Sequence, residues 1–239
     1  MFFKNILIVF CVVILSILGC NKDEDSVVNL NSSIAKLSSV AVFNAIPNST
    51  GLTLYIGQGT TQQMVISDSD KLIFGSYVTY KNWYAGSFDI MVQNQIDKSR
   101  EQVNYKLLLN AGKFYSLFLY QKNVQLQYLL TDDNIINPKD DYVKIRIAHL
   151  CEDIANMSIM DGTGSSLLFQ NIKFETITNF IEIDLNKLKD LTIQIDDHKI
   201  NFKDMAIFVN KGIYTIMLLQ PLDDSNDGKI TDYISVIKQ

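Results

Sequence analysis

The feature that most constrains this chain is a succession of short runs in which apolar and polar residues alternate with a period of two. Successive side chains of a strand point to opposite faces, so this period predicts strands and not helices. Residues 48–51 and 110–113 are rich in Asn and Gly and predict turns between the runs. In the first half we expect strands at residues 39–45, 52–57, 74–80, 88–93, 103–109, 114–120 and 125–130.

The pattern begins again after a polar segment, residues 134–141, which contains Pro138 and predicts a linker. Three pairs of segments match in the same order in the two halves: residues 52–57 with 157–162, 88–92 with 191–195, and 115–120 with 214–219. This repeat predicts an all-β protein of two tandem immunoglobulin-like antiparallel β-sandwich domains, at residues 39–133 and 141–239. A single larger β domain is the alternative.

The first 20 residues have the composition of a signal peptide. One cation, Lys4, precedes an apolar run at residues 6–18 that is too short to cross ~30 Å of hydrocarbon as a helix. Gly19 and Cys20 then resemble the bacterial lipobox, at which the cysteine is acylated and the chain is cut before it. We therefore predict a signal peptide at residues 1–19 and lipid on Cys20. The alternatives are an uncleaved transmembrane anchor and a secreted protein in which Cys20 has no role.

Residues 20–38 are polar and weakly patterned, which predicts a flexible tether between the lipid and the folded part. Lys22, Asp23 and Glu24 resemble the export signal of Bacteroidetes lipoproteins, which sends a protein to the outer face of the outer membrane. A solvated spacer is the alternative interpretation of these charges. The sequence thus predicts an outer-membrane, lipid-anchored protein exposed at the cell surface, with the membrane as its partner through the lipid on Cys20.

The charge balance argues against nucleic acid as a partner. The chain carries 21 basic and 26 acidic residues, a formal net charge of −5, and no cluster of Lys and Arg that would neutralise phosphates. Of the three cysteines, Cys11 lies in the predicted signal peptide and Cys20 carries the predicted lipid. Cys151 therefore has no partner for an intramolecular disulfide, and we expect it to be a small buried residue.

The familiar catalytic and cofactor motifs are missing from the sequence, which contains no G-x-x-x-x-G-K-[ST], G-x-S-x-G or H-E-x-x-H. His149 with Glu152 and Asp153 would suit a metal site or an acid–base pair. The counterparts in the first copy are Asn44, Pro47 and Asn48. Because these cannot do that chemistry, we expect His149 simply to form hydrogen bonds with its neighbours.

Residues 223–228 carry oxygen-bearing side chains and end in a glycine, like the first half of a calcium loop. Ile234 stands where such a loop has its bidentate glutamate, so we predict a hairpin turn there instead. The sequence accordingly predicts no metal, no cofactor and no catalytic residue.

Residues 74–84 hold the only tryptophan of the chain and three of its eleven tyrosines. In a strand, Tyr77 and Tyr80 fall on opposite faces, as do Trp83 and Tyr84, so some of these rings should be exposed. Exposed rings beside Asn and Lys suit a sugar-stacking or protein-docking surface. We take as candidate binding residues Tyr77, Tyr80, Trp83 and Tyr84. The alternative is that the rings pack in the sandwich and cover its edge.

The two copies also resemble a known family. Residues 41–57 and 145–162 are similar to the opening of the domain of unknown function 4397, in which an arginine, two apolar residues and a histidine precede a strand that ends in a glycine. Residues 112–115 and 212–214 resemble its later glycine and tyrosine. Two positions depart from the pattern: Asn44 replaces the histidine and Glu152 replaces a proline. The resemblance implies a tandem immunoglobulin-like lipoprotein and, since the family has no assigned activity, no site.

Two classes of function follow from these observations. The first is a cell-surface, non-catalytic binding, adhesion or scaffold lipoprotein whose partner is a glycan or a surface protein. The alternative is an extracellular hydrolase that acts on glycan polymers, with a carboxylate pair that cannot be distinguished among 26 acids.

Replacing Cys20 with serine tests the predicted anchor. The variant Cys20→Ser lacks the thiol that would be acylated, so it should leave the detergent phase in a phase-separation assay, whereas the parent protein stays there. Cys151→Ser is the matched control and should partition like the parent. Retention of Cys20→Ser in the detergent phase would contradict the lipoprotein interpretation.

Overall fold

The computed structural model describes residues 36–58, 61–103, 106–162, 164, 166–188, 191–196, 198–202, 208–220 and 234–239. The predicted signal peptide, Cys20, most of the predicted tether and the predicted turn at residues 223–228 lie outside the described residues. Within the described part, no helix is long and apolar enough to cross a membrane. Strands dominate the described chain, which confirms the all-β prediction.

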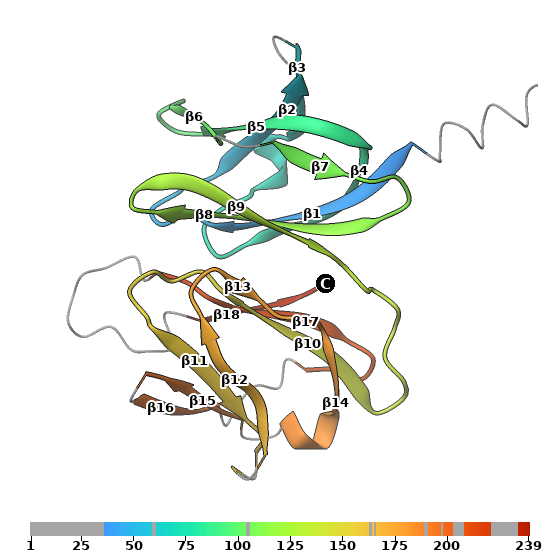
Figure 1. The fold of residues 1–239 in the computed structure, drawn as a ribbon, viewed down its shortest axis with the longest axis vertical. Helices are drawn as coiled ribbons and strands as arrows, with labels where there is room; N and C mark the ends of the chain where they lie inside the picture. The colour runs from blue at the N-terminus through green and yellow to red at the C-terminus, as the bar shows by residue number, and fades with distance from the viewer. Residues whose placement is uncertain are drawn as a thin grey trace, which may run out of the picture.

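The first half consists of two sheets (Figure 1). Its strands are β1 (Leu37–Ala45), β2 (Leu52–Gln58), β3 (Thr61–Ile66), β4 (Tyr77–Tyr84), β5 (Gly86–Asn94), β6 (Arg100–Gln102), β7 (Leu107–Leu109), β8 (Phe114–Lys122) and β9 (Gln125–Asp132), with a 3-10 turn at Asp68–Asp70. The inner sheet has the order β4-β1-β8-β9 and the outer sheet the order β3-β2-β5-β6, with β7 also paired to β5. Strand β3 escaped the sequence analysis because it is a largely exposed edge strand with few apolar residues.

The second half repeats this arrangement. Its strands are β10 (Tyr142–His149), β11 (Asn156–Met160), β12 (Leu167–Lys173), β13 (Thr176–Ile177), β14 (Ile181–Asp184), β15 (Leu191–Ile195), β16 (His198–Phe202), β17 (Ile213–Leu218) and β18 (Ile234–Lys238), with a 3-10 helix at Leu185–Leu188. The inner sheet is β13-β10-β17-β18, with β14 also on β10, and the outer sheet is β12-β11-β15-β16. No described sheet combines strands of the two halves.

Strand register shows how closely the halves match. The pairs β1–β8 and β10–β17 are both parallel, and the other strand pairs of the described sheets are antiparallel. Tyr115 lies opposite Val40 in the first half, and Tyr214 lies opposite Ile145 in the second. These are the positions that the sequence repeat aligns, so the two copies share topology and register in their inner sheets.

A tyrosine just inside each of these parallel strands fastens the preceding loop. The hydroxyl of Tyr115 accepts a hydrogen bond from the backbone N–H of Asn110 at 3.2 Å, and that of Tyr214 accepts one from Val209 at 2.8 Å. Immunoglobulin-like sandwiches use a tyrosine at a sheet corner in the same way. A Cβ at Gly212 would lie 2.4 Å from the Tyr214 ring, so this glycine is required by the tyrosine.

Each half has its own apolar core between its two sheets. Leu54, Ile90 and Leu117 are fully buried in the first, and Ile147, Ile193 and Ile216 in the second. The outer strands alternate buried and less buried residues, as a strand covered on one face should. The inner strands β8 and β17 are instead buried along most of their length, which indicates cover on both faces.

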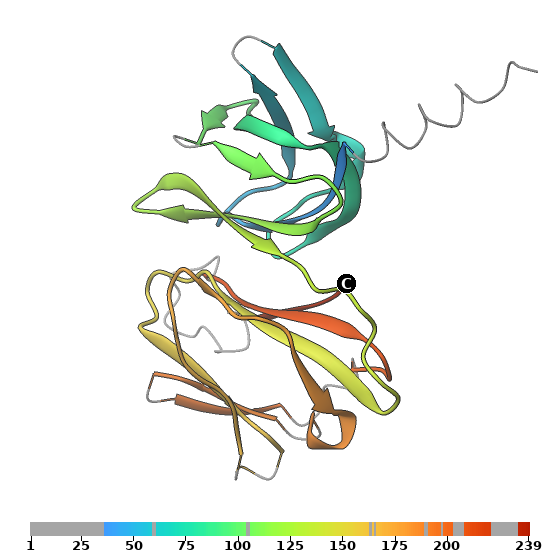
Figure 2. The same ribbon diagram turned by 45° about the vertical axis from the view of Figure 1, so that its right-hand side comes forward.

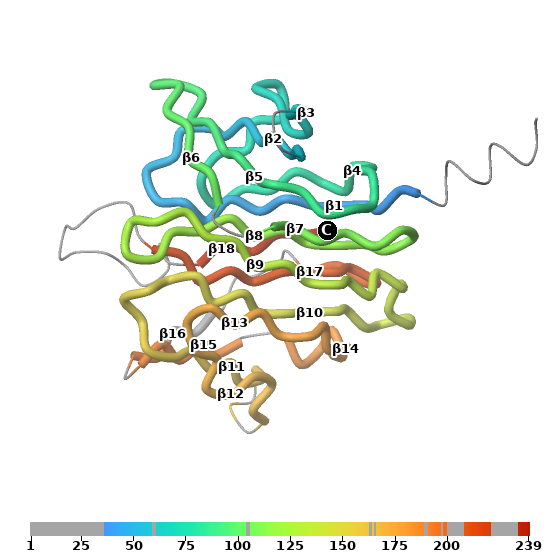
Figure 3. The backbone as a smooth tube through the Cα atoms, turned by 45° about the horizontal axis from the view of Figure 1, so that its top comes forward, coloured from blue at the N-terminus to red at the C-terminus, as the bar shows by residue number. Residues whose placement is uncertain are grey.

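The second cover of each inner sheet is the inner sheet of the other half. Figures 1 and 2 show the two inner sheets stacked, and Figure 3 shows β8 and β9 lying against β17 and β18. A third apolar cluster fills the space between them and includes Ala41, Phe43, Phe118, Tyr120, Ala148, Leu150, Met217 and Ile237. We define this contact as the junction. The linker predicted at residues 134–141 gave no indication that the two halves would pack against each other.

Arg146 of β10 is the polar centre of the junction and is only 1% exposed. Its Nη1 lies 2.5 Å from Oδ1 of Asp133 and donates to the Thr131 hydroxyl at 3.0 Å, and its Nη2 donates to the Ser116 hydroxyl at 2.6 Å, so it binds three residues of the first half. Its Nε donates to Thr215 of its own half at 2.9 Å. The Phe180 ring lies 4.3 Å from the guanidinium carbon. Burial lowers the pKa of Arg146, and the nearby Asp133 opposes that shift.

Asp133 is equally well satisfied. Its Oδ2 accepts hydrogen bonds from the hydroxyls of Ser116 (2.5 Å) and Tyr80 (2.6 Å), and its Oδ1 accepts one from Thr131 (2.9 Å) in addition to the arginine. A buried carboxylate without such partners would be strongly destabilising. The residue that ends the first predicted domain is therefore a fixed part of the junction.

The two members of the buried ion pair should be coupled in their effect on the free energy of unfolding. Arg146→Met leaves the Asp133 carboxylate buried without its cation and should cost about 3 to 5 kcal/mol of unfolding free energy. The double variant Arg146→Met, Asp133→Leu should cost less than the sum of the two single changes, because the uncompensated charge is gone. Urea unfolding measures all three variants. Additive costs, or single costs below about 1 kcal/mol, would contradict this account of the junction.

Candidate functional site

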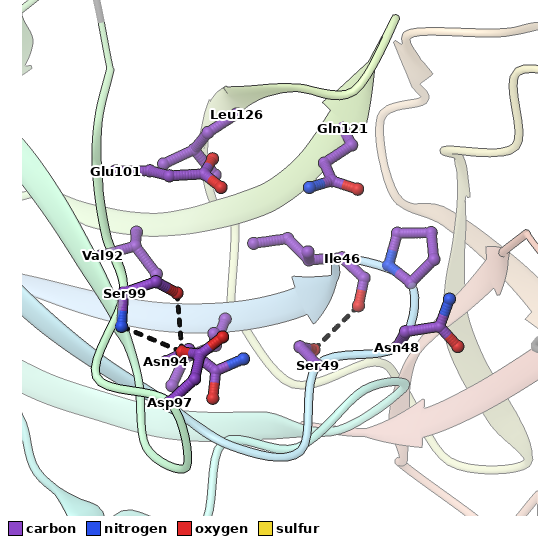
Figure 4. Close-up of a pocket in the computed structure, with 12 residues that line it drawn as sticks. Ile46, Asn48, Ser49, Val92, Asn94, Asp97, Ser99, Glu101, Gln121 and Leu126 are labelled. Carbon is purple, nitrogen blue, oxygen red and sulfur yellow. Dashed lines mark hydrogen bonds between the residues drawn. The ribbon is translucent and has the colours of Figure 1, made fainter.

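A cleft of about 200 Å³ opens at one end of the first half, where the turn after β1 meets the β5–β6 loop and the β8–β9 hairpin. We call it the end cleft; Figure 4 shows it. It is lined by Ile46, Pro47, Asn48, Ser49, Leu52, Val92, Asn94, Asp97, Ser99, Glu101, Gln121 and Leu126. Four of these are buried apolar residues that form its base: Ile46, Leu52, Val92 and Leu126.

Asn44 fixes the turn that forms one wall of the end cleft. Its Nδ2 donates to the Ser49 hydroxyl at 2.8 Å, and its Oδ1 accepts from the backbone N–H of Ile46 at 2.9 Å. Ser49 in turn donates to the Ile46 carbonyl at 2.7 Å. Asn48 adopts the left-handed region with φ of 58°, a conformation that asparagine tolerates well. The wall is therefore preformed by hydrogen bonds inside the turn.

A second hydrogen-bonded loop forms the facing wall. Oδ1 of Asp97 accepts hydrogen bonds from the backbone N–H of Ser99 at 2.9 Å and from its hydroxyl at 2.7 Å. These bonds, chiefly the one from the Ser99 side chain, lower the pKa of Asp97. Asn94 accepts from the backbone N–H of Ile96 at 2.9 Å. Asp97 is therefore an ionised acceptor and not a proton donor at neutral pH.

The charge of the end cleft comes from Asp97 and Glu101 alone. None of the 12 lining residues is Lys, Arg or His. In Figure 4, Glu101 and Gln121 lie above Asp97 and Ser49 in the view, with the space of the cleft between them. An arrangement of amides and carboxylates over an apolar base can bind a small polar ligand by hydrogen bonds, provided that the ligand is not an anion.

Sequence reasoning missed the end cleft. Its polar residues come from three segments, around residues 48, 97 and 121, that are far apart in the chain and meet only because the two sheets bring their loops together. The available signal was a set of Asn, Asp and Ser residues in loops, which also predicts ordinary turns.

The structure separates the four predicted aromatic binding residues. Trp83 is 3% exposed and lies in the first core, with no hydrogen-bond partner for its Nε1 among the described residues. Tyr77 donates to the backbone carbonyl of Lys238 at 2.7 Å and Tyr80 to Asp133, so both lie at the junction. Tyr84 alone is well exposed, at 60%. Some of these rings were expected to be exposed, which holds for Tyr84, whereas Trp83 packs in the sandwich as the alternative had it.

A β-bulge in β4 explains these positions. Val42 pairs with Val78 but Val40 pairs with Lys81, so β4 contains one extra residue between them. The extra residue reverses the faces beyond it, which turns Trp83 into the core. Tyr84 pairs with Leu37 at the start of β1, so it lies at the end of the sandwich opposite the end cleft and does not contribute to it.

The predicted histidine and its neighbours do not form a site. Glu152 accepts from the backbone N–H of Asn123 at 3.0 Å, and Asp153 accepts from the Gln220 amide at 2.6 Å. His149 is fully buried at the end of β10, and neither ring nitrogen has a hydrogen-bond partner among the described residues, contrary to expectation. The described part of the chain contains no group of three metal-ligating side chains.

Cys151 is buried and free, as predicted. Burial raises the pKa of its thiol to about 11, so it is protonated at neutral pH and unreactive.

Comparison with known proteins gives a family but no ligand. The family model described as domain of unknown function DUF4397 matches residues 38–160. No curated protein sequence matches the chain. A family 26 carbohydrate-binding module from Eubacterium rectale, solved with maltoheptaose, is similar at 7% identity and a TM-score of 0.24, with 85% of this chain and 97% of that one covered. A candidate cell adhesion protein from Bacteroides uniformis is similar at 11% identity and a TM-score of 0.20, with 85% and 96% covered.

Acid should destabilise the protein through His149. Burial lowers the pKa of this histidine to about 4, below its ordinary value of about 6.5. The unfolded state therefore binds the proton first, so stability present above pH 6.5 is lost as the pH falls toward 4, by up to about 2 kcal/mol between pH 7 and 5.

The variant His149→Asn, which copies Asn44 of the first half, should lack this loss. Urea unfolding of both proteins at pH 7 and pH 5 measures the difference. His198→Asn, a change at the exposed histidine, is the matched control and should keep the acid sensitivity of the parent. Equal pH dependence in the parent and His149→Asn would contradict the assignment.

Proposed function

Since this chain belongs to the DUF4397 family, a family of domains without an assigned activity, we propose its function from its own geometry: a non-catalytic binding protein, held at the bacterial cell surface by lipid on Cys20. The observation that carries the proposal is the position of the end cleft. The chain enters the first half at the start of β1, and the end cleft lies beyond the last residue of that strand. The nine residues of the strand span eight steps of about 3.3 Å, which puts the two roughly 26 Å apart.

This separation suits a tethered binding protein. An anchor that precedes Leu37 would attach the chain at one end of the sandwich, so the tether would not cover the end cleft at the other end, which stays open to ligands outside the cell. The junction supports the same role, because a body in which two sandwiches share a buried ion pair presents the cleft from a rigid frame.

A glycan hydrolase is less well supported by the end cleft. Most glycosidases need two carboxyl groups, one of which stays protonated as the general acid because its pKa is raised. Asp97 is one of the two carboxyl groups that line the cleft, and its pKa is lowered by Ser99. Asp97 is therefore unsuited to the role of the general acid.

A binding assay combined with a turnover assay tests the proposal. The full lipoprotein, inserted in vesicles of neutral phospholipid, is incubated with insoluble polysaccharides and with extracellular matrix proteins. Sedimentation measures the bound protein, and chromatography of the supernatant measures released fragments.

We expect retention on at least one of these materials without any release of fragments. Fragment release that disappears in Glu101→Gln would overturn the proposal in favour of the hydrolase. Absence of retention on every material would also overturn it.

A further inference from the structure

The second half shows what the end cleft would look like if it were closed. By the sequence repeat, Asn48 and Gln121 correspond to Asp153 and Gln220. In the second half the Gln220 amide donates to Oδ2 of Asp153 at 2.6 Å and joins the turn after β10 to the end of β17. In the described first half, Asn48 and Gln121 make no such bond, and both line the end cleft.

The open state is therefore not a requirement of the fold. Both halves have the same strand order and the same register between their first and penultimate strands. In the second copy the carboxylate of Asp153 accepts a hydrogen bond from Gln220. In the first copy Asn48 stands in place of this aspartate, and the bond is missing. The difference leaves two amide groups in the first copy free to bond a guest.

The polar atoms of the end cleft define the chemistry of that guest. The carboxylate of Glu101 and the second oxygen of Asp97 accept hydrogen bonds only, so the guest must donate to them. The amides of Asn48 and Gln121 both donate and accept, as hydroxyl groups do. Because no cation lines the cleft, a carboxylate or phosphate guest would meet two negative charges without compensation.

The size of the end cleft limits the guest to one small unit. A volume of about 200 Å³ corresponds to about six or seven water molecules at ~30 Å³ each and is smaller than the ~300 to 1,000 Å³ of most drug-sized sites. Its base of Ile46, Leu52, Val92 and Leu126 can contact the C–H face of a ring. No aromatic ring lines the cleft, so a single unit should bind weakly.

We propose that the end cleft binds one neutral sugar unit of a glycan, with its hydroxyl groups donating to Glu101 and Asp97 and exchanging hydrogen bonds with Asn48 and Gln121. This inference rests on the proposed binding function and names its site and its ligand class. A basic side chain of a peptide is the competing guest, because it would also satisfy the carboxylates. The sugar is favoured because amides are as numerous as carboxylates among the free groups, and an ammonium cannot accept from the amide N–H groups. Weak single sites at a cell surface gain strength when many anchored copies bind one polymer.

Ligand-observed NMR on the full lipoprotein in phospholipid vesicles tests the proposal. The probes are glucose, galactose, mannose and N-acetylglucosamine as neutral sugars, glucuronate as an anionic sugar, and a trilysine peptide. Two variants address the cleft. Asn48→Asp should let Gln121 form the closing bond of the second half, and Glu101→Gln removes a charged acceptor. Asp153→Asn in the second half is the matched control, and thermal melting verifies that each variant is folded.

We expect at least one neutral sugar to bind, and each cleft variant to weaken it by about ten- to a hundredfold. Glu101→Gln loses a hydrogen bond to a charged group, and Asn48→Asp closes the cleft with the bond from Gln121. Asp153→Asn should bind like the parent, and glucuronate should bind more weakly than the neutral sugars. Sugar binding that survives both cleft variants would overturn the site. Binding of trilysine but of no sugar would overturn the ligand class.

The failure of this inference differs from the failure of the proposed function. If no sugar binds while the protein is still retained on a polymer or a matrix protein without turnover, the end cleft is not the sugar site but the binding function stands. If retention is also absent, both are overturned.

Discussion

The contact between Arg146 and Asp133 is the interaction on which the arrangement of the two halves depends. A guanidinium that is 1% exposed must have all its donors bonded, and here the partners come from both halves. A buried ion pair is weak evidence for added stability, because desolvation of both charges offsets much of their attraction. The planar donors of the Arg146 guanidinium do, however, fix the orientation and register of one half relative to the other. The apolar cluster around Phe43 and Phe118 would allow the two sheets to slide, whereas the arginine accepts a single alignment.

The repeat kept its framework and diverged at the positions where the copies do different work. The tyrosines that fasten the loops before β8 and β17 occur in both copies, as do the cores between the sheets. The counterpart of Arg146 in the first copy is Ala41. The second copy therefore supplies the cation of the junction, and the first supplies its partner, Asp133. His149 corresponds to Asn44, which organises a turn, whereas the buried histidine ring has no hydrogen-bond partner among the described residues.

The two ends of the first half also have different roles. The end that carries Leu37 and Tyr84 receives the chain, and the opposite end carries the end cleft. Both sheets of the first half are held in place, the inner one by the junction and the outer one by the core beneath it. Loops attached to such a frame lose little additional entropy when they bind a ligand, which compensates in part for a small site without aromatic rings.

The sequence by itself determined the strands, the repeat and the absence of the familiar catalytic motifs, because side-chain alternation, turn residues and short motifs are local properties. The sequence also carries a sign of the junction, because residues 114–120 of β8 and most of β17 are nearly continuous apolar runs, as strands covered on both faces are. Only the tertiary structure decided the burial of Trp83, because one extra residue in β4 reverses the faces beyond it and a bulge has no reliable local pattern. The pairing of Arg146 with Asp133 and the assembly of the end cleft were also decided by the tertiary structure alone, since both bring together different segments of the chain. A period of two shows which residues of a strand share a face, but not which other part of the chain packs against that face.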